Sequence, residues 1–474
     1  MWKKLLITGC VTFSLLSGGT LSAQPSCEIK EEVTSEQLDR TQKELVAMMK
    51  ELKNDSYFQT ELDKAAVQSS LSKRMAAYKD LTVRLLSVLE IQAELEWMKP
   101  EAIQEALGIM KKSSGFDAVL ADKRFGELKS LLAGGFDGIY TGDAQAIDKA
   151  NKTLTLKRKL MLMSPDVNVD KMLTVKFDLG ERANFVGAGS LGIQPNNWSN
   201  LSSASRKNFK AQLVELSGLQ SGELSEKVLY KPAVDGSSVT DLVLNWDGKR
   251  LMFTALDTTR RWQVHELDIN NGEAKQVTNI PEPDLEFFDG TYLPDGRMLA
   301  ISNIGYQGVP CVNGSDAVGN MVLYDPSNGY LRRLTFDQDA NWHPVVMANG
   351  KVMYVRWEYT DLTHYFSRIV MHMNPDGTEQ KSLYGSGSMF PNSIFDVQPL
   401  PKHTNRFVGV ISGHHGVARS GRLMIFDPAK SRKEEKGMIQ ELPFRGRPII
   451  PEVKDELVNG VWPQFIKPYP LTDE

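Results

Sequence analysis

The sequence has few cysteines and no large excess of either charge. Only 3 of its 474 residues are Cys, which excludes a small scaffold held together by disulfides. Its 55 basic residues against 59 acidic ones give a formal net charge of −4, so the composition gives no reason to expect nucleic acid as a partner. Hydrophobic residues make up 41% of the chain, which excludes a disordered protein. The chain is therefore globular and long enough for two or three domains.

Long hydrophobic runs are missing beyond the amino terminus. Lys3 and Lys4 precede an apolar stretch, Leu5–Leu16, and the small residues that follow end at Ala23. This order is typical of a secretory signal peptide cleaved after Ala23. An alternative is lipoprotein processing at Cys10, although few apolar residues precede it. No later segment has about 18 uninterrupted apolar residues, so we expect a secreted, periplasmic protein without a transmembrane segment.

Residues 24–160 show helical spacing without the alternation of strands. Thr34 and Gln37 match a capping box, and a set of apolar residues then falls on one helix face: Leu38, Leu45, Met48, Met49 and Leu52. Pro100 disfavours helix at the residue before it and ends the longest helical segment. Further helices are expected over 56–98, 101–112, 117–133 and 143–162. Alternating charges indicate a solvated helical domain, and a coiled coil that binds a protein partner is the alternative.

The remaining residues, 161–474, change to short β-rich runs between turn residues. A turn motif repeats at intervals of 48 and 54 residues, as Asp247-Gly248, Asp295-Gly296 and Asn349-Gly350. Such pairs between apolar runs are typical of type I′ hairpins, in which both central residues have positive φ. An outer hairpin also repeats, over 265–272, 322–329, 371–377 and 423–428. Each repeat is the size of one four-stranded propeller blade.

These repeats predict a mainly β fold, a β-propeller of about five to six four-stranded blades that follows the helical domain in the sequence. The expected blades are 172–234, 235–281, 282–338, 339–388 and 389–446. Propellers of this kind usually close with six or seven blades, and residues 447–474 are too few for another one. The alternatives are an incomplete ring and a ring closed in an unusual way. With the signal peptide at 1–23, the domains are then 24–160 and 161–474.

The turn sequences broadly resemble those of TolB-like propellers. A closer resemblance runs through Tyr292–Gly296, Gln307–Val312, Leu334–Pro344, Arg356–Asp361, His364–Phe366, Met373–Gly377 and Gly413–Gly416. These motifs are similar to the middle, propeller domain of the hydrazine synthase alpha subunit and its secreted relatives. The resemblance covers about residues 155–471. It implies a propeller fold and a secreted location more than a particular reaction.

The haem chemistry of hydrazine synthase is not expected here. Covalent haem attachment needs Cys-x-x-Cys-His, and Cys27 and Cys311, the two cysteines left after signal cleavage, do not form this motif. No covalent haem is therefore predicted, and hydrazine synthesis is not supported. A disulfide between these two cysteines and two separate thiols both remain open. Serine hydrolase, nucleotide-binding and zinc protease motifs are absent from the sequence.

Three chemically active residues occupy equivalent positions in successive repeats. Counting back six residues from the turn position of each copy gives Asp241, Asp289 and His343. The innermost strand of a blade lines the central channel, so we expect these side chains to converge at the channel mouth. A structural alternative is that the aspartates cap backbone N–H groups of neighbouring strands.

Further candidates lie on segments expected at the same end of the propeller. Most histidines fall late in the chain, and together with Cys or Asp they have the chemistry of a zinc- or manganese-type divalent metal site. The metal candidates are Cys311, His343, His364, His414 and His415. The other binding candidates are Asp337, Asp339, Asp361, Trp342 and Trp357. For the tryptophans, a platform for a sugar ring and packing between blades are the alternatives.

The sequence therefore predicts a secreted propeller that binds a small ligand or glycan, a metal or a partner at its channel mouth. The main alternative is a metal-dependent enzyme, for example a lyase acting on acidic sugars. A second alternative is a scaffold that binds a protein partner through the helical domain. Whether the protein is an enzyme is left open.

Overall fold

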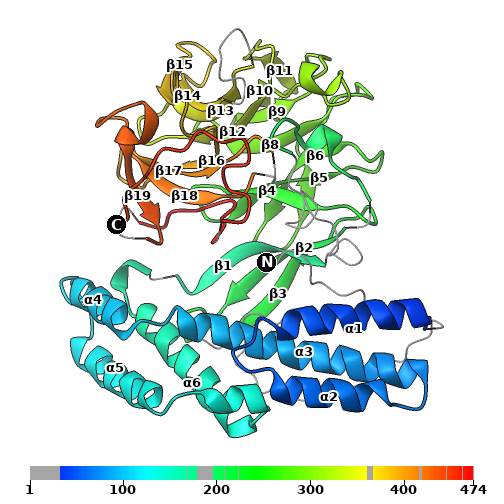
Figure 1. The fold of residues 1–474 in the computed structure, drawn as a ribbon. Coiled ribbons are helices and arrows are strands. Elements are labelled where there is room, and N and C mark those ends of the chain that lie inside the picture. Colours follow the sequence, from blue (N-terminus) through cyan, green and yellow to red (C-terminus); the bar gives the residue numbers. More distant parts are fainter. Residues whose placement is uncertain are drawn as a thin grey trace. The chain divides into compact units, whose positions relative to one another are not determined.

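The computed structural model divides the chain into two compact units (Figure 1). The first holds the described residues up to Met172 together with 216–226, and the second holds 173–215 and 227–474. The structure describes residues 33–167, 169–178, 196–207, 209–221, 224–359, 367–415, 419–444, 446–461 and 463–472. The signal peptide prediction and Cys27 lie outside these ranges. No helix in the described ranges is long and apolar enough to span a membrane.

The first unit is helical. Its helices are α1 (Ser35–Met49), α2 (Ser56–Ala66), α3 (Leu71–Glu96), α4 (Pro100–Met110), α5 (Ala118–Ala133) and α6 (Ala144–Met161), with short 3-10 turns η1 (Asp137–Thr141) and η2 (Pro165–Val167). The predicted capping box is confirmed: Gln37 N donates to Thr34 Oγ1 at 3.2 Å, and Thr34 N donates to Gln37 Oε1 at 3.0 Å. The five apolar residues predicted for one face of α1 and the turn after it are all buried.

The prediction of one helix over 56–98 is wrong. The chain forms two helices, α2 and α3, because Ser70 begins a new helix by accepting a hydrogen bond from Lys73 N at 3.2 Å. Serine caps a helix start well because its hydroxyl satisfies a free backbone N–H group. The predicted interruption before Pro100 is confirmed, since α3 ends at Glu96 and α4 begins at Pro100.

The second unit consists mainly of antiparallel sheets, which confirms the mainly β prediction. Four consecutive sets of four strands follow one another, and we call them blades 1 to 4. Blade 1 holds β4 (Val239–Leu244), β5 (Arg250–Leu256), β6 (Trp262–Asp268) and β7 (Ala274–Gln276), and blade 2 holds β8 (Phe287–Tyr292), β9 (Met298–Ser302), β10 (Asn320–Asp325) and β11 (Tyr330–Arg333). Blade 3 holds β12 (Asn341–Val346), β13 (Val352–Trp357), β14 (Arg368–Met373) and β15 (Lys381–Tyr384), and blade 4 holds β16 (Ser393–Pro399), β17 (Phe407–Ser412), β18 (Arg422–Phe426) and β19 (Met438–Leu442). The interval 172–234 holds a three-stranded sheet instead, of β1 (Lys171–Asp178), β2 (Lys210–Ser217) and β3 (Ser225–Tyr230).

The blades pack in a propeller-type order. The first strands contact one another in sequence, β4 with β8, β8 with β12 and β12 with β16. One parallel bridge between Arg368 and Ser393 joins blades 3 and 4 into a continuous sheet. Strands β9 and β17 are buried along their whole length, as expected for strands covered on both faces. This packing brings the first strands, and the side chains they carry, to the middle of the unit.

The three hairpin turns predicted to be of type I′, between the first two strands of blades 1 to 3, are of another type. Positive φ occurs at the glycines, for example 67° at Gly248 and 90° at Gly296, but not at Asp247 or Asp295. Gly296 N donates to Leu293 O at 3.1 Å, and Leu293 N donates to Arg297 O at 2.8 Å. These bonds close a three-residue loop in which only the last residue is left-handed, so a single glycine suffices.

Candidate functional site

The three repeated positions lie within strands rather than where the strands begin. Asp241, Asp289 and His343 have φ values of 55°, 54° and 53°, and each lies where the pairing of the first two strands shifts register. Such β-bulges re-aim a side chain out of the regular alternation. Asp and His are among the residues that most readily adopt a left-handed backbone. The backbone therefore explains part of the choice of residue at these positions.

Two further residues complete this pattern, and the sequence analysis missed both. Asp396 in β16 has φ 49° beside the register shift of blade 4, and Lys467 has φ 45°. Counting back six residues from Lys402, which has φ 61°, gives Asp396. The turn that contains Lys402 has no glycine, so the repeat was hidden in the sequence. We call Asp241, Asp289, His343, Asp396 and Lys467 the central polar ring.

Backbone hydrogen bonds connect the ring from one position to the next. Asp241 Oδ2 accepts from Asp289 N at 3.1 Å, and Asp289 Oδ2 accepts from His343 N at 2.5 Å. Asp396 Oδ2 accepts from Lys467 N at 3.0 Å. Asp241 and Asp289 thus each satisfy an N–H group at the bulge of the next blade, and Asp396 satisfies that of Lys467. These contacts favour the structural alternative for the aspartates, in which they cap neighbouring segments.

Side-chain charges connect the same five residues. Lys467 Nζ lies 3.3 Å from Asp241 Oδ1 and 3.3 Å from Asp396 Oδ1. His343 Nδ1 lies 3.3 Å from Asp289 Oδ2, and His343 Nε2 lies 3.2 Å from Asp396 Oδ1. Burial alone would raise the pKa of Asp289, but the charge of His343 and its hydrogen bonds hold that pKa below its ordinary value. Burial would lower the pKa of Lys467, and the Asp396 and Asp241 carboxylates instead hold it above its ordinary value.

A second cation lies near the ring. Arg419 is 3% exposed, and its guanidinium lies 4.6 Å from the Trp342 ring and 5.1 Å from the Phe395 ring. Burial lowers the pKa of Arg419 to about 10, although the carboxylates of Asp396, Asp289 and Asp241 oppose that shift. Three carboxylates therefore face two cations, Lys467 and Arg419, besides His343. The carboxylates of the ring are thus largely neutralised by Lys467 and by the neighbouring Arg419.

A short segment, residues 196–207, reaches loops of all four blades, and we call it the cap segment. Asn197 is 1% exposed, its Oδ1 accepts from Arg419 N at 2.7 Å, and its carbonyl accepts from Arg368 Nε at 2.9 Å. Asn200 Nδ2 donates to Ala317 O at 2.6 Å. Arg419 and Ala317 belong to the connections between the second and third strands of blades 4 and 2, and Arg368 is the first residue of β14 in blade 3. The cap segment therefore lies against the end of the unit where these residues meet, and the predicted channel-mouth site stays a prediction.

The predicted histidine pair lies beneath this segment. His414 is 6% exposed and its Nδ1 accepts a hydrogen bond from Arg368 Nη1 at 2.9 Å. Burial, with the neighbouring charges of Arg368 and His415, lowers the pKa of His414 to about 3. His415 is about half exposed, and its Nδ1 lies 2.8 Å from Asp455 Oδ2. His414 is thus a neutral acceptor for an arginine.

The described metal candidates do not form one centre. His343 contacts the ring carboxylates, whereas His414 contacts Arg368, a cation that would repel a metal ion. Within the described ranges, no three His, Cys, Asp or Glu side chains are placed to hold a metal. Asp361 and His364 lie outside these ranges, as does the side chain of Cys311, whose backbone is in the 3-10 turn η6 (Pro310–Val312). The metal site therefore stays a prediction.

The remaining described candidates contact neighbouring residues of the fold. Asp337 Oδ1 lies 3.2 Å from Arg356 Nε, and Asp339 Oδ2 accepts from Tyr359 N at 3.0 Å. Burial raises the pKa of Asp339 to about 6. Trp342 and Trp357 are each 1% exposed, and their ring centroids are 6.3 Å apart. These tryptophans pack in the core and offer no exposed platform for a sugar ring.

A pocket that the sequence analysis did not predict lies beside the cap segment. Its volume is about 260 Å³, and its walls include Ser202, Ser203 and Arg206 of the cap segment. Loops of blades 1 and 2 supply the other walls, including Arg261, Asp284, Glu286, Asn303, Ser315 and Ala317. No repeat or motif marked these residues, because they come from connections that differ between blades. We call this hollow the cap pocket.

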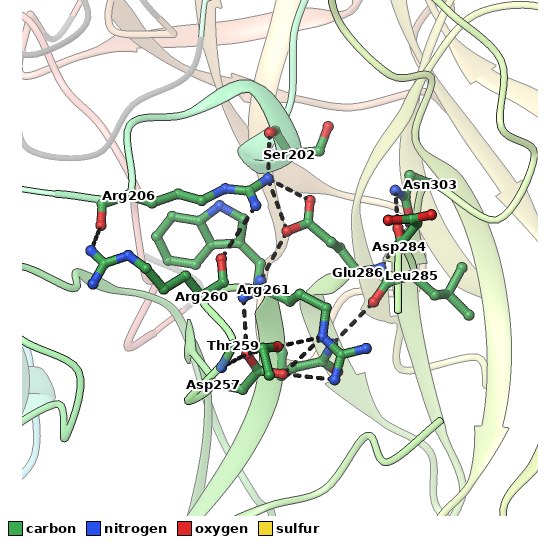
Figure 2. Close-up of polar contacts among 12 residues, drawn as sticks. Ser202, Arg206, Asp257, Thr259, Arg260, Arg261, Asp284, Leu285, Glu286 and Asn303 are labelled. Carbon is green, nitrogen blue, oxygen red and sulfur yellow. Dashed lines mark hydrogen bonds and ion pairs between the residues drawn. The ribbon is translucent and has the colours of Figure 1, made fainter. Parts of the chain in front are cut away.

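An ion pair crosses the cap pocket. Figure 2 shows the Arg206 guanidinium directed toward the Glu286 carboxylate, and Nη2 donates to Oε2 at 3.0 Å. Arg206 also donates to Ser202 O at 2.9 Å and to Arg260 O at 3.2 Å. The side chain of Glu286 is 5% exposed, and Oε1 accepts from Trp262 N at 3.1 Å. Burial raises the pKa of Glu286, and the charge of Arg206 opposes that shift.

A second layer of hydrogen bonds fixes these walls. Asn303 Oδ1 accepts from Glu286 N at 2.9 Å, and Asn303 Nδ2 donates to Asp284 O at 2.9 Å (Figure 2). Arg261 Nη2 lies 2.9 Å from Asp257 Oδ2, and Arg261 Nη1 donates to Glu282 O at 2.7 Å. Polar side chains held in this way keep their positions before a ligand arrives. The cap pocket is therefore a preorganised polar site.

Comparisons with known proteins give low similarities. No protein family and no curated protein matches the sequence. Among solved structures, hydrazine synthase from Kuenenia stuttgartiensis is 12% identical with a TM-score of 0.40, over 57% of this chain and 39% of that one. TolB from Acinetobacter baumannii is 18% identical with a TM-score of 0.33, over 46% of each chain. An oligogalacturonate lyase in complex with manganese is 14% identical with a TM-score of 0.32, over 50% of this chain and 62% of that one.

This chain therefore spans less than two thirds of the length of each of these three structures. Membership of the hydrazine synthase alpha subunit family stays a prediction. The sheet unit itself is of propeller type, as its strand order and packing show.

Proposed function

We propose that this chain is a secreted, propeller-type binding protein that holds a small polar ligand in the cap pocket. The observation that carries the proposal is the preorganised polar lining of that pocket. Arg206, Glu286 and Asn303 are each held by hydrogen bonds to a different part of the wall. Concave sites with a few fixed polar groups are the usual places where proteins bind small molecules.

The central polar ring supports binding rather than catalysis as the role of the sheet unit. Its carboxylates accept backbone N–H groups and contact Lys467, so they contribute to holding the blades together. A general base or nucleophile must lie within reach of a substrate. The cap segment also contacts all four blades, and its Asn197 is only 1% exposed.

Export is part of the same proposal. The basic Lys3-Lys4 start, the apolar run and the small residues before Gln24 support cleavage after Ala23. Mass measurement of the protein recovered from the periplasm of a producing cell tests this directly. A chain that retains its first 23 residues and stays in the cytoplasm would overturn the export proposal.

Binding in the cap pocket is tested by screening the mature protein against diverse small polar compounds, with ligand-observed NMR as the readout. We expect compounds that compete for one site, and Ser203→Trp should abolish their binding because the indole fills the pocket. Ser203 is exposed, so this substitution should leave the fold intact. Ser205→Trp, two residues away and outside the pocket lining, is the matched control. Absence of binders, or binders unaffected by Ser203→Trp, contradicts the proposed function.

A further inference from the structure

We propose that the ligand of the cap pocket is an uncharged, polyhydroxylated molecule the size of one sugar ring. This inference rests on the proposed function and names the class of ligand. Three features of the pocket carry it: the balance of its charges, the mixture of its hydrogen-bonding groups and its volume.

The charges of the lining cancel. Two arginines, Arg206 and Arg261, face two carboxylates, Asp284 and Glu286. Arg206 is already paired with Glu286 at 3.0 Å, and Arg261 is paired with Asp257 at 2.9 Å. An anionic ligand would have to displace a carboxylate from Arg206 or Arg261, and a cationic ligand would face both of these guanidinium groups. The pocket therefore favours a ligand without net charge, because a buried charge without a partner is costly.

The lining offers donors and acceptors side by side. Guanidinium groups only donate and carboxylates only accept, whereas serine hydroxyls do both. Ser202, Ser203 and Ser315 contribute hydroxyls. Arg206 contributes groups that only donate, and Asp284 and Glu286 contribute groups that only accept. Ser202 Oγ also lies 2.5 Å from Asn200 Oδ1, which fixes its direction. A ligand hydroxyl both donates and accepts, so several hydroxyls on one ring match this mixture.

The volume limits the size of the ligand. The pocket measures about 260 Å³, below the roughly 300–1,000 Å³ that is usual for drug-sized ligands. One ring with its hydroxyl groups fits this volume. The side chains lining the pocket are polar apart from Pro283 and Ala317, which disfavours a large apolar ligand.

Arg206 is the positioning residue of this site. Its guanidinium joins the cap segment, through Ser202 O, to Glu286 beside blade 2 and to Arg260 O of blade 1. One side chain thus sets the distance between the two walls. Asp284 has a different role, because its carboxylate is exposed and contributes one of the two negative charges of the lining.

The test uses calorimetric titration of the mature protein with matched sugars. Glucose, galactose and inositol are the uncharged probes, and glucuronate and glucosamine are the charged ones. We expect uncharged probes to bind at least about tenfold more tightly than charged probes. Their affinity should stay constant between low and high salt, because no charge pairing with the ligand is involved. Ser203→Trp should abolish this binding, and Ser205→Trp should not.

Asp284→Asn adds a test of the charge balance. It leaves the lining with one more positive than negative group, so the affinity for glucuronate relative to glucose should rise by about threefold or more. If a charged probe binds wild-type protein as tightly as its uncharged match, or if affinity falls with salt, the ligand class is wrong while binding in the pocket stands. If neither set binds in the pocket but other compounds from the screen do, the ligand class alone fails. If nothing binds there, both proposals fail.

Discussion

The ammonium group of Lys467 lies 3.3 Å from a carboxylate oxygen of Asp241, a residue 226 positions earlier in the chain. The same ammonium group lies 3.3 Å from Asp396 in blade 4. Lys467 therefore joins the first strand of blade 1 to the first strand of blade 4. Its neighbour Phe465 pairs with Gly421 of blade 4, so a short carboxyl-terminal segment supplies the fifth position of the central polar ring.

Lys467→Met should destabilise the sheet unit. The substitution keeps a long side chain but leaves the Asp241 and Asp396 carboxylates without their shared cation. Because the Lys467 side chain is 36% exposed, we expect a loss of about 1–2 kcal/mol in the free energy of unfolding, less than for a fully buried pair. Urea denaturation measures it.

Lys430→Met, at an exposed lysine of the same unit, is the control and should change stability by less than about 0.5 kcal/mol. Asp241→Asn combined with Lys467→Met should recover part of the loss, because one uncompensated charge is removed. Equal effects of Lys467→Met and Lys430→Met would show that the ring ion pairs contribute nothing.

Stability should fall in acid through the ring carboxylates. The pKa values of Asp289 and Asp396 are held below their ordinary values, in each case against the opposing effect of burial. A carboxyl whose folded pKa is depressed stabilises the fold above its unfolded pKa, about 3.9, and that contribution is lost as pH falls toward the folded pKa. Wild-type protein should therefore lose stability more steeply below about pH 4 than Asp289→Asn does.

Asn at position 289 keeps an oxygen that accepts the His343 N–H group, so the backbone contact survives in the variant. Melting temperatures of both proteins between pH 2 and pH 7 give the comparison. Parallel curves would contradict a depressed pKa at Asp289.

Gly421→Ala should destabilise blade 4 where its second and third strands approach each other. A Cβ atom at Gly421 would lie 1.9 Å from Ile411 O, a backbone atom that cannot move aside cheaply. Gly421 also exchanges two backbone hydrogen bonds with Phe465, at 2.8 and 3.1 Å. We expect a loss of about 2–3 kcal/mol or more, measured by urea denaturation of the sheet unit.

Gly126→Ala in α5 is the matched control, because a Cβ there meets nothing within 4 Å. Alanine is the better helix former, so this variant should gain up to about 1 kcal/mol in the helical unit. A Gly421→Ala protein as stable as wild type would show that the close approach to Ile411 is not maintained.

Metal removal should leave the melting temperature of the sheet unit unchanged to within about 1 °C. Lys467 already supplies positive charge between Asp241 and Asp396, so the ring needs no added cation. The measurement is thermal unfolding with and without a chelator, together with elemental analysis of the purified protein. Stoichiometric zinc or manganese that is lost in His343→Ala would contradict this expectation and restore the predicted metal centre.

The sequence predicted well those features that depend on neighbouring residues. The capping box at Thr34, the interruption before Pro100 and the equivalent positions of Asp241, Asp289 and His343 all follow from local spacing. Asp396 was missed because its hairpin turns through Lys402 rather than a glycine, so the repeat left no visible mark. Local chemistry also explains why one helix was wrongly predicted over 56–98. The Ser70 hydroxyl accepts a hydrogen bond from Lys73 N and so starts a second helix.

Features that depend on distant residues could not be predicted. Nothing near Lys467 in the sequence indicates that its side chain meets Asp241, because that contact exists only after four blades have packed. The cap pocket has the same origin, since Arg206 and Glu286 are 80 residues apart and meet through the cap segment. The contacts of Asn197 are of the same kind, since its partners lie more than 200 residues along the chain.

The position of Lys467 also has a consequence for the order of folding. Each blade pairs strands that are close in sequence, so blades can form one after another as the unit folds. Packing of blades 1 and 4 brings the Asp241 and Asp396 carboxylates close together, and both lack their shared ammonium group until the segment that carries Lys467 docks. Docking of this segment should therefore be a late folding step that follows the packing of the blades.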